Sequence, residues 1–552
     1  MSTFVKYFLL MCLCFTFLYL SFNLRNLQFK PRSYKDKMDI ADDSNEQSTL
    51  AAAEGLLLPR GTQTAQADLL PVNKVEHPME KPSRPHIVFI LADDLGWSDI
   101  GYHGNAVHTP FIDQLANTGV KLGNYYAQPN CSPSRASFLT GKYSDRNGIQ
   151  HAFRDGQAAC LPLYHRTLPE ILKQNGYSTH LVGKWHLGHC REECLPYNRG
   201  FDTFFGMLGG SSNLFSHISH GNYDFWDQNK RAMKYKGVYS AEAYGEKAVE
   251  VIENHANSKN ENPMFLFLSF QVPHEPQQVP PSYINKWKSY ANVKPERRKK
   301  LFGQISCMDE VVNKVVNSLK HNHLWNNTVV IFSSDNGGPF RNEASNIPLR
   351  GQKRTHFEGG IRVVGFVNSP LLSAEVQGKT FNGLIGIADW FPTFIEGMAG
   401  GQTDRVDIDG KNVWDSLRYG TPSPREDYVI SVGEECLGVP VRNNTKYWDT
   451  MGIDPRTSIR SGPWKLIVQQ DDTDPSTKPA DVLLFNVDLD ITESTNLAEE
   501  NEDIVRRLRQ RVKEYCSKTV PIVSFKTKHF PKSSNDNQKG CQLDEKYVRR
   551  GN

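Results

Sequence analysis

The chain has 552 residues, of which 38% are hydrophobic and 23% are charged, and its formal net charge is +3 at pH 7. This composition is typical of a globular enzyme and argues against a disordered chain or a protein with many membrane spans. The near-neutral charge gives no reason to expect nucleic acid as a partner. The length predicts one large catalytic domain and a smaller appended domain.

The N-terminus carries an apolar segment from Tyr7 to Phe22, preceded by Lys6. Its length suits a signal peptide or a short membrane anchor. Basic residues follow it, but long domains cross membranes largely regardless of flanking charge. The small residues of a cleavage site are missing around Ser21, which favours an uncleaved signal-anchor. We expect residues 1–23 to direct the chain into the secretory pathway, as a lysosomal, secreted or type II anchored protein.

Residues 24–84 are polar and lack periodicity, so we interpret them as a flexible stem. The ten cysteines include no C-x-x-C pair, which argues against a structural zinc site. In a lumenal protein several of them should form disulfides. Sequons at Asn326 and Asn443 fit the secretory route, although so short a pattern also occurs by chance.

The folded region is expected to begin at His86, where an apolar run over residues 86–91 predicts a strand buried on both faces. Three further apolar strands each follow a helical stretch. The helical stretches cover residues 167–175, 241–254 and 303–319, and the strands cover residues 180–183, 264–270 and 328–333. Strands that alternate with helices predict an α/β domain with a mostly parallel sheet, over residues 85–429.

Residues 430–552 have a different pattern. Short β-like runs at 464–468 and 483–487 are separated by Asp, Pro, Thr and Gly, and a helix is expected from Glu502 to Tyr515. These features predict a small C-terminal α+β domain with an antiparallel sheet.

Polar residues gather where the strands of the large domain end. They are Asp93, Asp94, Lys184, His186, His274, Asp335 and Asn336. Ligands of open α/β sheets bind at the carboxyl ends of the strands. We therefore expect the functional site at this edge of the sheet.

The segment from Cys131 to Gly141 reads C-S-P-S-R-A-S-F-L-T-G. From its chemistry, Cys131 is either an activated thiolate near Arg135 or a buried cysteine at a helix start. However, the segment closely resembles the sulfatase signature C-x-P-S-R followed by L-T-G. This resemblance implies that a formylglycine-generating enzyme converts Cys131 to formylglycine in the endoplasmic reticulum.

Two pairs of oxygen-bearing side chains predict a divalent cation site. Asp93–Asp94 and Asp335–Asn336 each follow a strand, and oxygen donors suit Ca²⁺ or Mg²⁺. An isolated Asp-Asp pair would more simply be a turn or helix cap. Glycines after Asn336 would let the backbone approach the site closely. Both pairs are similar to sulfatase metal ligands, and the resemblance implies one calcium ion that position 131 also contacts.

The string G-K-W-H-L-G around Lys184 and His186 resembles the second sulfatase signature. If the segment were extended, these two side chains would face the same side. His274 and Lys353 stand where the family has residues that contact sulfate, although Gln352 occupies a position that is often basic. The resemblance thus implies a catalytic set of Cys131, Arg135, Lys184, His186, His274 and Lys353.

The resemblance extends from His86 to about Val512, and its segments are most similar to the arylsulfatase B, or N-acetylgalactosamine 4-sulfatase, type. It implies an alkaline-phosphatase-like fold and a sulfated carbohydrate or small-molecule sulfate ester as substrate, as in glycosaminoglycan degradation. It also implies a Cys160–Cys194 disulfide. A cysteine expected near Gly156 is absent, so Cys516 is expected to pair with Cys541.

Two other functions were weighed. A phosphatase or phosphodiesterase of the related alkaline phosphatase superfamily would use Ser or Thr and a histidine-rich pair of zinc ions, which this sequence lacks. A sulfatase-like binding protein without turnover would have lost part of the catalytic set, and no member of the set is missing.

Overall fold

The computed structural model describes residues 84–523, with gaps at 105–106, 155–156, 158, 259–260, 287–295, 404–405, 434–435, 437–456 and 470–480. The expected signal-anchor, the stem, Asn443 and Cys541 lie outside the described residues. Among the residues described, no helix combines the length and apolar character that a membrane span requires. Asn326 of the other sequon is exposed.

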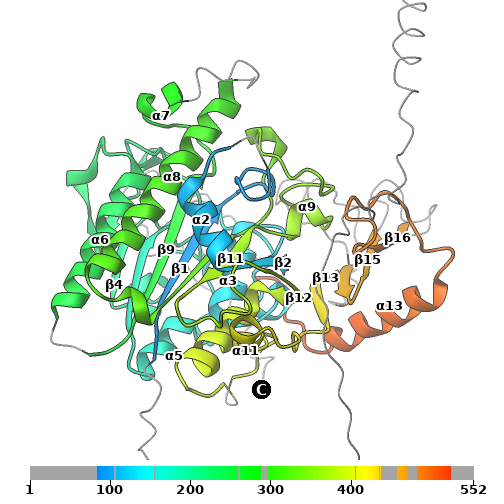
Figure 1. Cartoon of the computed structure of the whole chain (residues 1–552). Coiled ribbons are helices and arrows are strands. Elements are labelled where there is room, and N and C mark those ends of the chain that lie inside the picture. Colours follow the sequence, from blue (N-terminus) through cyan, green and yellow to red (C-terminus); the bar gives the residue numbers. More distant parts are fainter. Residues whose placement is uncertain are drawn as a thin grey trace, which may run out of the picture. The chain divides into compact units, whose positions relative to one another are not determined.

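The large domain is built on a ten-stranded mixed sheet (Figure 1). Across the sheet the strands run β12 (Thr380–Gly386), β2 (Val120–Tyr126), β11 (Gly365–Asn368), β10 (Thr328–Ser334), β1 (His86–Asp93), β9 (Met264–Pro273), β3 (Ser178–Gly183), β4 (Thr203–Gly206), β7 (Trp226–Asp227) and β8 (Lys230–Arg231). The central strands β10, β1, β9, β3 and β4 are parallel, as expected from the alternation of strands and helices. A separate hairpin pairs β5 (Ile218–Ser219) with β6 (Asn222–Tyr223).

Alternate residues of β1 enter two different hydrophobic cores, one on each face of the sheet. Ile87, Phe89 and Leu91 pack on one face, and Val88 and Ile90 on the other. All five side chains are buried. The predicted two-sided burial of this strand is therefore confirmed.

Helices cover both faces of the sheet. The face with Phe89 packs against α3 (Cys131–Thr140), α5 (Leu168–Gln174), α10 (Trp390–Pro392) and α11 (Trp414–Tyr419), and the other face packs against α2 (Pro110–Thr118), α6 (Ser240–Asn257) and α8 (Glu296–His321). Shorter helices are α4 (Ser144–Asn147), α7 (Pro281–Lys286) and α9 (Glu358–Ile361). The expected helices correspond to α5, α6 and α8, and α8 begins earlier than its sequence pattern indicated.

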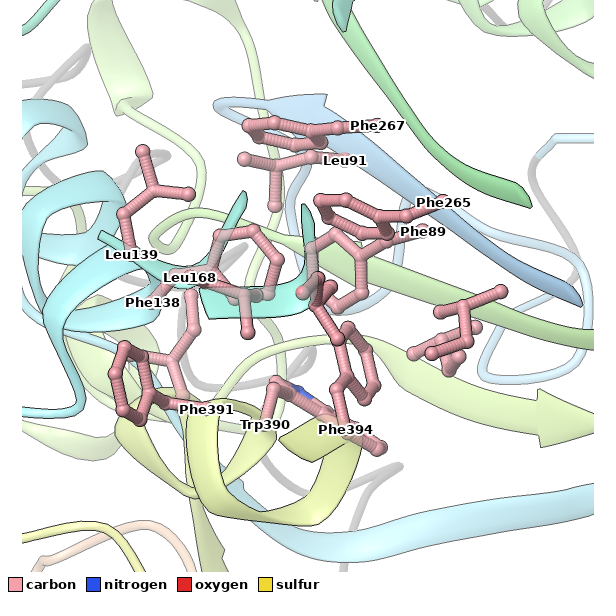
Figure 2. Close-up of a cluster of buried hydrophobic side chains, with 14 of the residues drawn as sticks. Phe89, Leu91, Phe138, Leu139, Leu168, Phe265, Phe267, Trp390, Phe391 and Phe394 are labelled. Carbon is pink, nitrogen blue, oxygen red and sulfur yellow. The ribbon is translucent and has the colours of Figure 1, made fainter. Parts of the chain in front are cut away.

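The core on the α3 face fixes that helix against the sheet (Figure 2). Phe138 of α3 stacks on Phe89 of β1, with 4.2 Å between ring centroids, and also packs against Phe267 and Phe394. Every residue of α3 is buried. The start of α3 is thereby held at a defined place beside the strand ends.

The C-terminal residues form a four-stranded antiparallel sheet, as expected. Its order is β13 (Asp427–Val432), β14 (Thr457–Ser461), β15 (Trp464–Gln469) and β16 (Asp481–Asn486), and α13 (Glu502–Cys516) follows. The first strand starts just before the expected boundary at residue 430. The boundaries of the domains otherwise stay predictions.

Two disulfides join pairs of described cysteines, and Cys190 is disulfide-bonded as well. Cys160 pairs with Cys194, which confirms the bond implied by the resemblance. The expected Cys516–Cys541 bond is wrong, because Cys516 at the end of α13 pairs with Cys436. Cys436 follows β13, and α13 packs against β13, so the fold brings together two cysteines that are 80 residues apart.

Candidate active site

The register of the central strands gathers the polar residues at one edge of the sheet. Ala92 of β1 pairs with Ser334 of β10, so the Asp93 and Asp335 that follow lie at the same level. On the other side of β1, Asp93 pairs with Pro273, which places His274 next to the acidic pair. Asp94 adopts a positive φ of 65°, which turns the chain sharply after the strand.

The predicted metal ligands lie together and are fully buried. The Asn336 amide donates to Asp94 Oδ1 at 2.7 Å, and the Asp94 backbone amide donates to Asp335 Oδ1 at 3.2 Å. Ligand atoms of Asp93, Asp94, Cys131 and His274 all lie within 4.8 Å of one another. The two strand ends therefore converge on one small space.

Three buried oxygens of this cluster are left without a hydrogen-bond partner among the described residues. They are Asp93 Oδ1, Asp94 Oδ2 and Asn336 Oδ1. Buried polar atoms are normally satisfied, and carboxylate and amide oxygens are the donors that hard divalent cations prefer. The residues present thus fit a bound divalent cation.

Three cations balance the three carboxylates of the site. Lys184 pairs with Asp93 Oδ2, Lys353 lies 2.5 Å from Asp94 Oδ1, and Arg135 lies 3.1 Å from Asp335 Oδ2. A bound divalent cation would leave this buried site with a positive charge, which attracts an anionic ester.

The charges set the protonation of the acids. Burial alone would raise the pKa of Asp93 and Asp94, but the positive charges of Lys184 and Arg135 near Asp93 and of Lys353 near Asp94 outweigh it and hold both pKa values below their usual range. Burial, together with the charge of Asp93, raises the pKa of Asp335 to about 7. Asp93 and Asp94 are therefore carboxylates at neutral pH.

Arg135 is fully engaged with the protein. Its guanidinium donates to Asp335 Oδ2, to the Lys184 carbonyl at 3.0 Å and to Ser269 Oγ at 2.6 Å. It lies one turn after Cys131 on α3, so the helix and the acidic cluster hold each other in place. This geometry suits the orientation of the acidic ligands better than direct contact with sulfate.

Cys131 occupies the first position of α3. The Asn130 side chain accepts a hydrogen bond from the Cys131 backbone amide at 3.1 Å, and Lys353 Nζ lies 3.1 Å from the Cys131 sulfur. Burial raises the pKa of the Cys131 thiol to about 11, although Lys184 and Lys353 oppose the shift. An unmodified thiol here is protonated at neutral pH, which disfavours the activated-thiolate reading.

His274 lies at the edge of the cluster. Its Nδ1 is 2.7 Å from the Glu275 carbonyl, and its Nε2 is 3.6 Å from Asp94 Oδ2. Because a carbonyl only accepts, Nδ1 carries the proton and the neutral ring presents Nε2 toward the acids. Burial lowers the pKa of His274, although Asp93 and Asp94 oppose this shift.

His186 is placed differently from expectation. The strand ends at Gly183, and His186 has a φ of 59°, so the segment is not extended and the argument from alternation fails. Its Nε2 lies 2.8 Å from the Phe153 carbonyl, while its own carbonyl accepts from Ser132 beside Cys131. Burial and the charge of Lys184 lower the pKa of His186, so the ring is neutral.

Two residues that support the site were not singled out from the sequence. Asn130 caps α3, and a residue of this type directly before a helix is a readable signal. Ser269 bonds to Arg135 from within β9, and its sequence signal is a single hydroxyl residue in the apolar run M-F-L-F-L-S-F of residues 264–270.

Comparisons with known proteins agree with this arrangement. The family model "Sulfatase" matches residues 85–400. The chain is 38% identical over 474 residues to arylsulfatase J of Mus musculus, with 80% of this chain and 77% of the relative covered. It is 30% identical over 365 residues to N-acetylgalactosamine-6-sulfatase of Homo sapiens, with 61% of this chain and 67% of the relative covered.

Among solved structures, Ps i-CgsB in complex with k-i-k-neocarrahexaose superposes with a TM-score of 0.70 at 27% identity, covering 80% of this chain and 95% of that one. The phosphonate monoester hydrolase SpPMH of Silicibacter pomeroyi shares the fold at a TM-score of 0.56 and 16% identity, covering 80% of this chain and 97% of that one. This fold therefore also occurs in a hydrolase of another ester class, so it does not by itself define the reaction.

Fold, site and relatives together define an enzyme, a sulfuric ester hydrolase. The chain belongs to the sulfatase family. The relative at 38% identity is an arylsulfatase J, so the comparison supports the family without supporting the arylsulfatase B type.

Proposed function

We propose that this protein is a calcium-dependent sulfatase whose nucleophile is a formylglycine made from Cys131. The observation that carries the proposal is the position of Cys131 at the start of α3, with its sulfur 3.1 Å from Lys353 Nζ and within 4.8 Å of ligand atoms of Asp93 and Asp94. A protonated thiol is a poor nucleophile, so the unmodified cysteine would not supply the attacking group.

The residues that would hold calcium are Asp93, Asp94, Asp335, Asn336 and the side chain at position 131. Calcium prefers six to eight oxygen ligands, and Asp93, Asp94, Asp335 and Asn336 offer carboxylate and amide oxygens. A hydrated formylglycine supplies two hydroxyl groups, one to attack sulfur and one whose deprotonation later releases sulfate.

The surrounding residues divide the remaining tasks. Lys184 and Lys353 each pair with one aspartate and have further N–H donors for the sulfate oxygens. Arg135 orients Asp335. Lys353, or His274 after its Nε2 has taken up a proton, protonates the departing alcohol oxygen. His186 is proposed to hold the second hydroxyl through Nδ1, which has no hydrogen-bond partner among the described residues, while Nε2 stays on the Phe153 carbonyl.

The proposed substrate is a sulfated carbohydrate. The named relatives include an N-acetylgalactosamine-6-sulfatase, and Ps i-CgsB was solved with a neocarrahexaose. We further propose that the protein matures in the secretory pathway, where a formylglycine-generating enzyme acts on it and residues 1–23 serve as signal or anchor. The two disulfides support an oxidising compartment.

The test compares the full chain, Cys131→Ala and Cys307→Ala, all secreted from the same cells, on an aryl sulfate with calcium. Cys307 is a free, buried cysteine of α8, so its substitution is a matched control. We expect Cys131→Ala to lose hydrolysis and Cys307→Ala to keep it, with mass spectrometry showing the loss of thiol at position 131. Hydrolysis that persists in Cys131→Ala would refute the proposal.

A further inference from the structure

Lys353 is carried by a tight loop of residues 350–360, here called the Lys353 loop. The Gly359 amide donates to the Arg350 carbonyl at 2.6 Å, which closes the loop at its base. Next to Lys353, the Arg354 amide donates to the Pro129 carbonyl at 2.7 Å. The position of the Lys353 ammonium beside Cys131 thus depends on how this loop is held.

One residue of the C-terminal region bonds to both arms of the loop base. A carboxylate oxygen of Glu493 accepts from the Glu358 amide at 2.7 Å, and the Glu493 carbonyl accepts from Arg350 at 2.8 Å. Glu493 is fully buried and has a φ of 53°, a conformation that is uncommon for a residue other than glycine. A buried acid in such a conformation persists only where its surroundings hold it.

Lys465 of β15 supplies the charge that Glu493 needs. Its Nζ lies 2.8 Å from Glu493 Oε1 and 3.0 Å from Glu358 Oε1, and all three side chains are buried. If one partner of a buried ion pair moves away or is removed, the other is left as an unpaired buried charge, which is energetically costly. The positions of the two partners are therefore strongly constrained. Lys465 therefore ties Glu493 and the first residue of α9 into one unit.

We infer that Glu493 and Lys465 are positioning residues for Lys353, so that the C-terminal sheet completes the active site. This inference rests on the proposed role of Lys353 in sulfate ester hydrolysis. Neither residue touches the cluster around Cys131 directly. They act by fixing both ends of the Lys353 loop. The fixed loop in turn sets the distance between the Lys353 ammonium and the side chain at position 131.

The first measurement needs no activity. Hydrogen–deuterium exchange is compared between the full wild-type chain, Glu493→Ala and a control, Arg425→Met. The control breaks another buried ion pair, the one between Arg425 and Asp389. Neither of these two residues takes part in the contacts of the Lys353 loop described above. We expect at least tenfold faster exchange of the amides of residues 350–360 in Glu493→Ala only. Unchanged exchange of the loop, or equal acceleration in the control, would overturn the inference.

The second measurement is a double-mutant cycle on kcat with Lys353→Ala. We expect Lys353→Ala to lower kcat by about 10²-fold in the wild-type background. In the Glu493→Ala background it should lower kcat by less than about tenfold, since the ammonium is already misplaced. Full additivity of the two substitutions would overturn the inference.

Conservative variants separate positioning from folding. Glu493→Gln keeps an oxygen acceptor for the Glu358 amide and is expected to retain more kcat than Glu493→Ala. If Glu493→Ala does not fold, Lys465→Met replaces it in both measurements, because it removes the ion pairs of Lys465 with Glu493 and Glu358. Retention of hydrolysis by Cys131→Ala would instead refute the proposed function, so the two failures are distinguishable.

Discussion

Gly337 offers a direct test of how the acidic cluster is positioned. It follows Asn336, and its amide donates to the Gly360 carbonyl at 3.0 Å, so the end of β10 packs on the backbone of α9. A Cβ atom at position 337 would lie 1.8 Å from the Gly359 carbonyl oxygen. The obstacle is main chain, which cannot rotate away as the end of a flexible side chain can.

The size of the effect follows from these distances. Real Cβ atoms essentially never come closer than 3.0 Å to another heavy atom, so Gly337→Ala must separate the two segments by about 1.2 Å. A displacement of that size would break the 2.7 Å hydrogen bond from Asn336 to Asp94. Misplacement by about 1 Å in an active site costs on the order of 10² in rate, so we expect kcat/KM to fall about 100-fold.

The assay measures aryl sulfate hydrolysis and calcium affinity, by calorimetry, for Gly337→Ala and for Gly303→Ala as control. Gly303 lies inside α8, where a Cβ would approach side-chain atoms, those of Val279 at 3.2 Å and of Tyr283 at 3.4 Å. The control should keep its activity, because alanine favours a helix interior. If folded Gly337→Ala retained kcat/KM within about twofold and bound calcium normally, our account of this close approach would be refuted.

Three further outcomes are expected. Chelation of calcium with EGTA should abolish hydrolysis and lower the Tm, because calcium at 100 times its Kd stabilises the folded state by about 2.7 kcal/mol. An unchanged Tm and an unchanged rate would contradict the calcium site. Phe138→Ala, which removes a buried ring stacked on Phe89, should lower the free energy of unfolding by about 3–5 kcal/mol in urea titrations, and a loss below about 1 kcal/mol would contradict the role of this core. Burial raises the pKa of Asp145 to about 7, so the folded state holds the Asp145 proton more tightly than the unfolded chain does. The free energy of unfolding of the wild type should therefore fall as the pH rises from about 4 to 7. Asp145→Asn should remove this part of the decline in Tm scans across that range, and parallel curves would refute the assignment.

The sequence predicted the central strands and helices well because their signals are local. The apolar run at residues 86–91 is long enough to be buried on both faces, and β1 is buried in that way. The helices α5 and α6 appear where expected, and α8 covers its expected stretch but begins earlier, at Glu296. The cluster of polar residues at strand ends was also foreseeable, because parallel strands end at the same edge of a sheet.

Other features depended on contacts between residues far apart in the chain. The disulfide partner of Cys516 is Cys436, which no local pattern indicates. The expectation that Lys184 and His186 face the same side assumed an extended segment, whereas the chain turns at His186. The link from Glu493 and Lys465 to the Lys353 loop spans more than a hundred residues and leaves no periodicity in the sequence.

The sequence by itself determined the family and the α/β class, and it predicted the residues that carry the chemistry, because local motifs and hydrophobic periodicity record these features directly. Only the tertiary structure decided which charges pair, that Arg135 faces the carboxylates, and that the C-terminal sheet supports Lys353. The physical reason is that strand register, burial and ion pairing depend on three-dimensional distances, and sequence separation does not determine those distances.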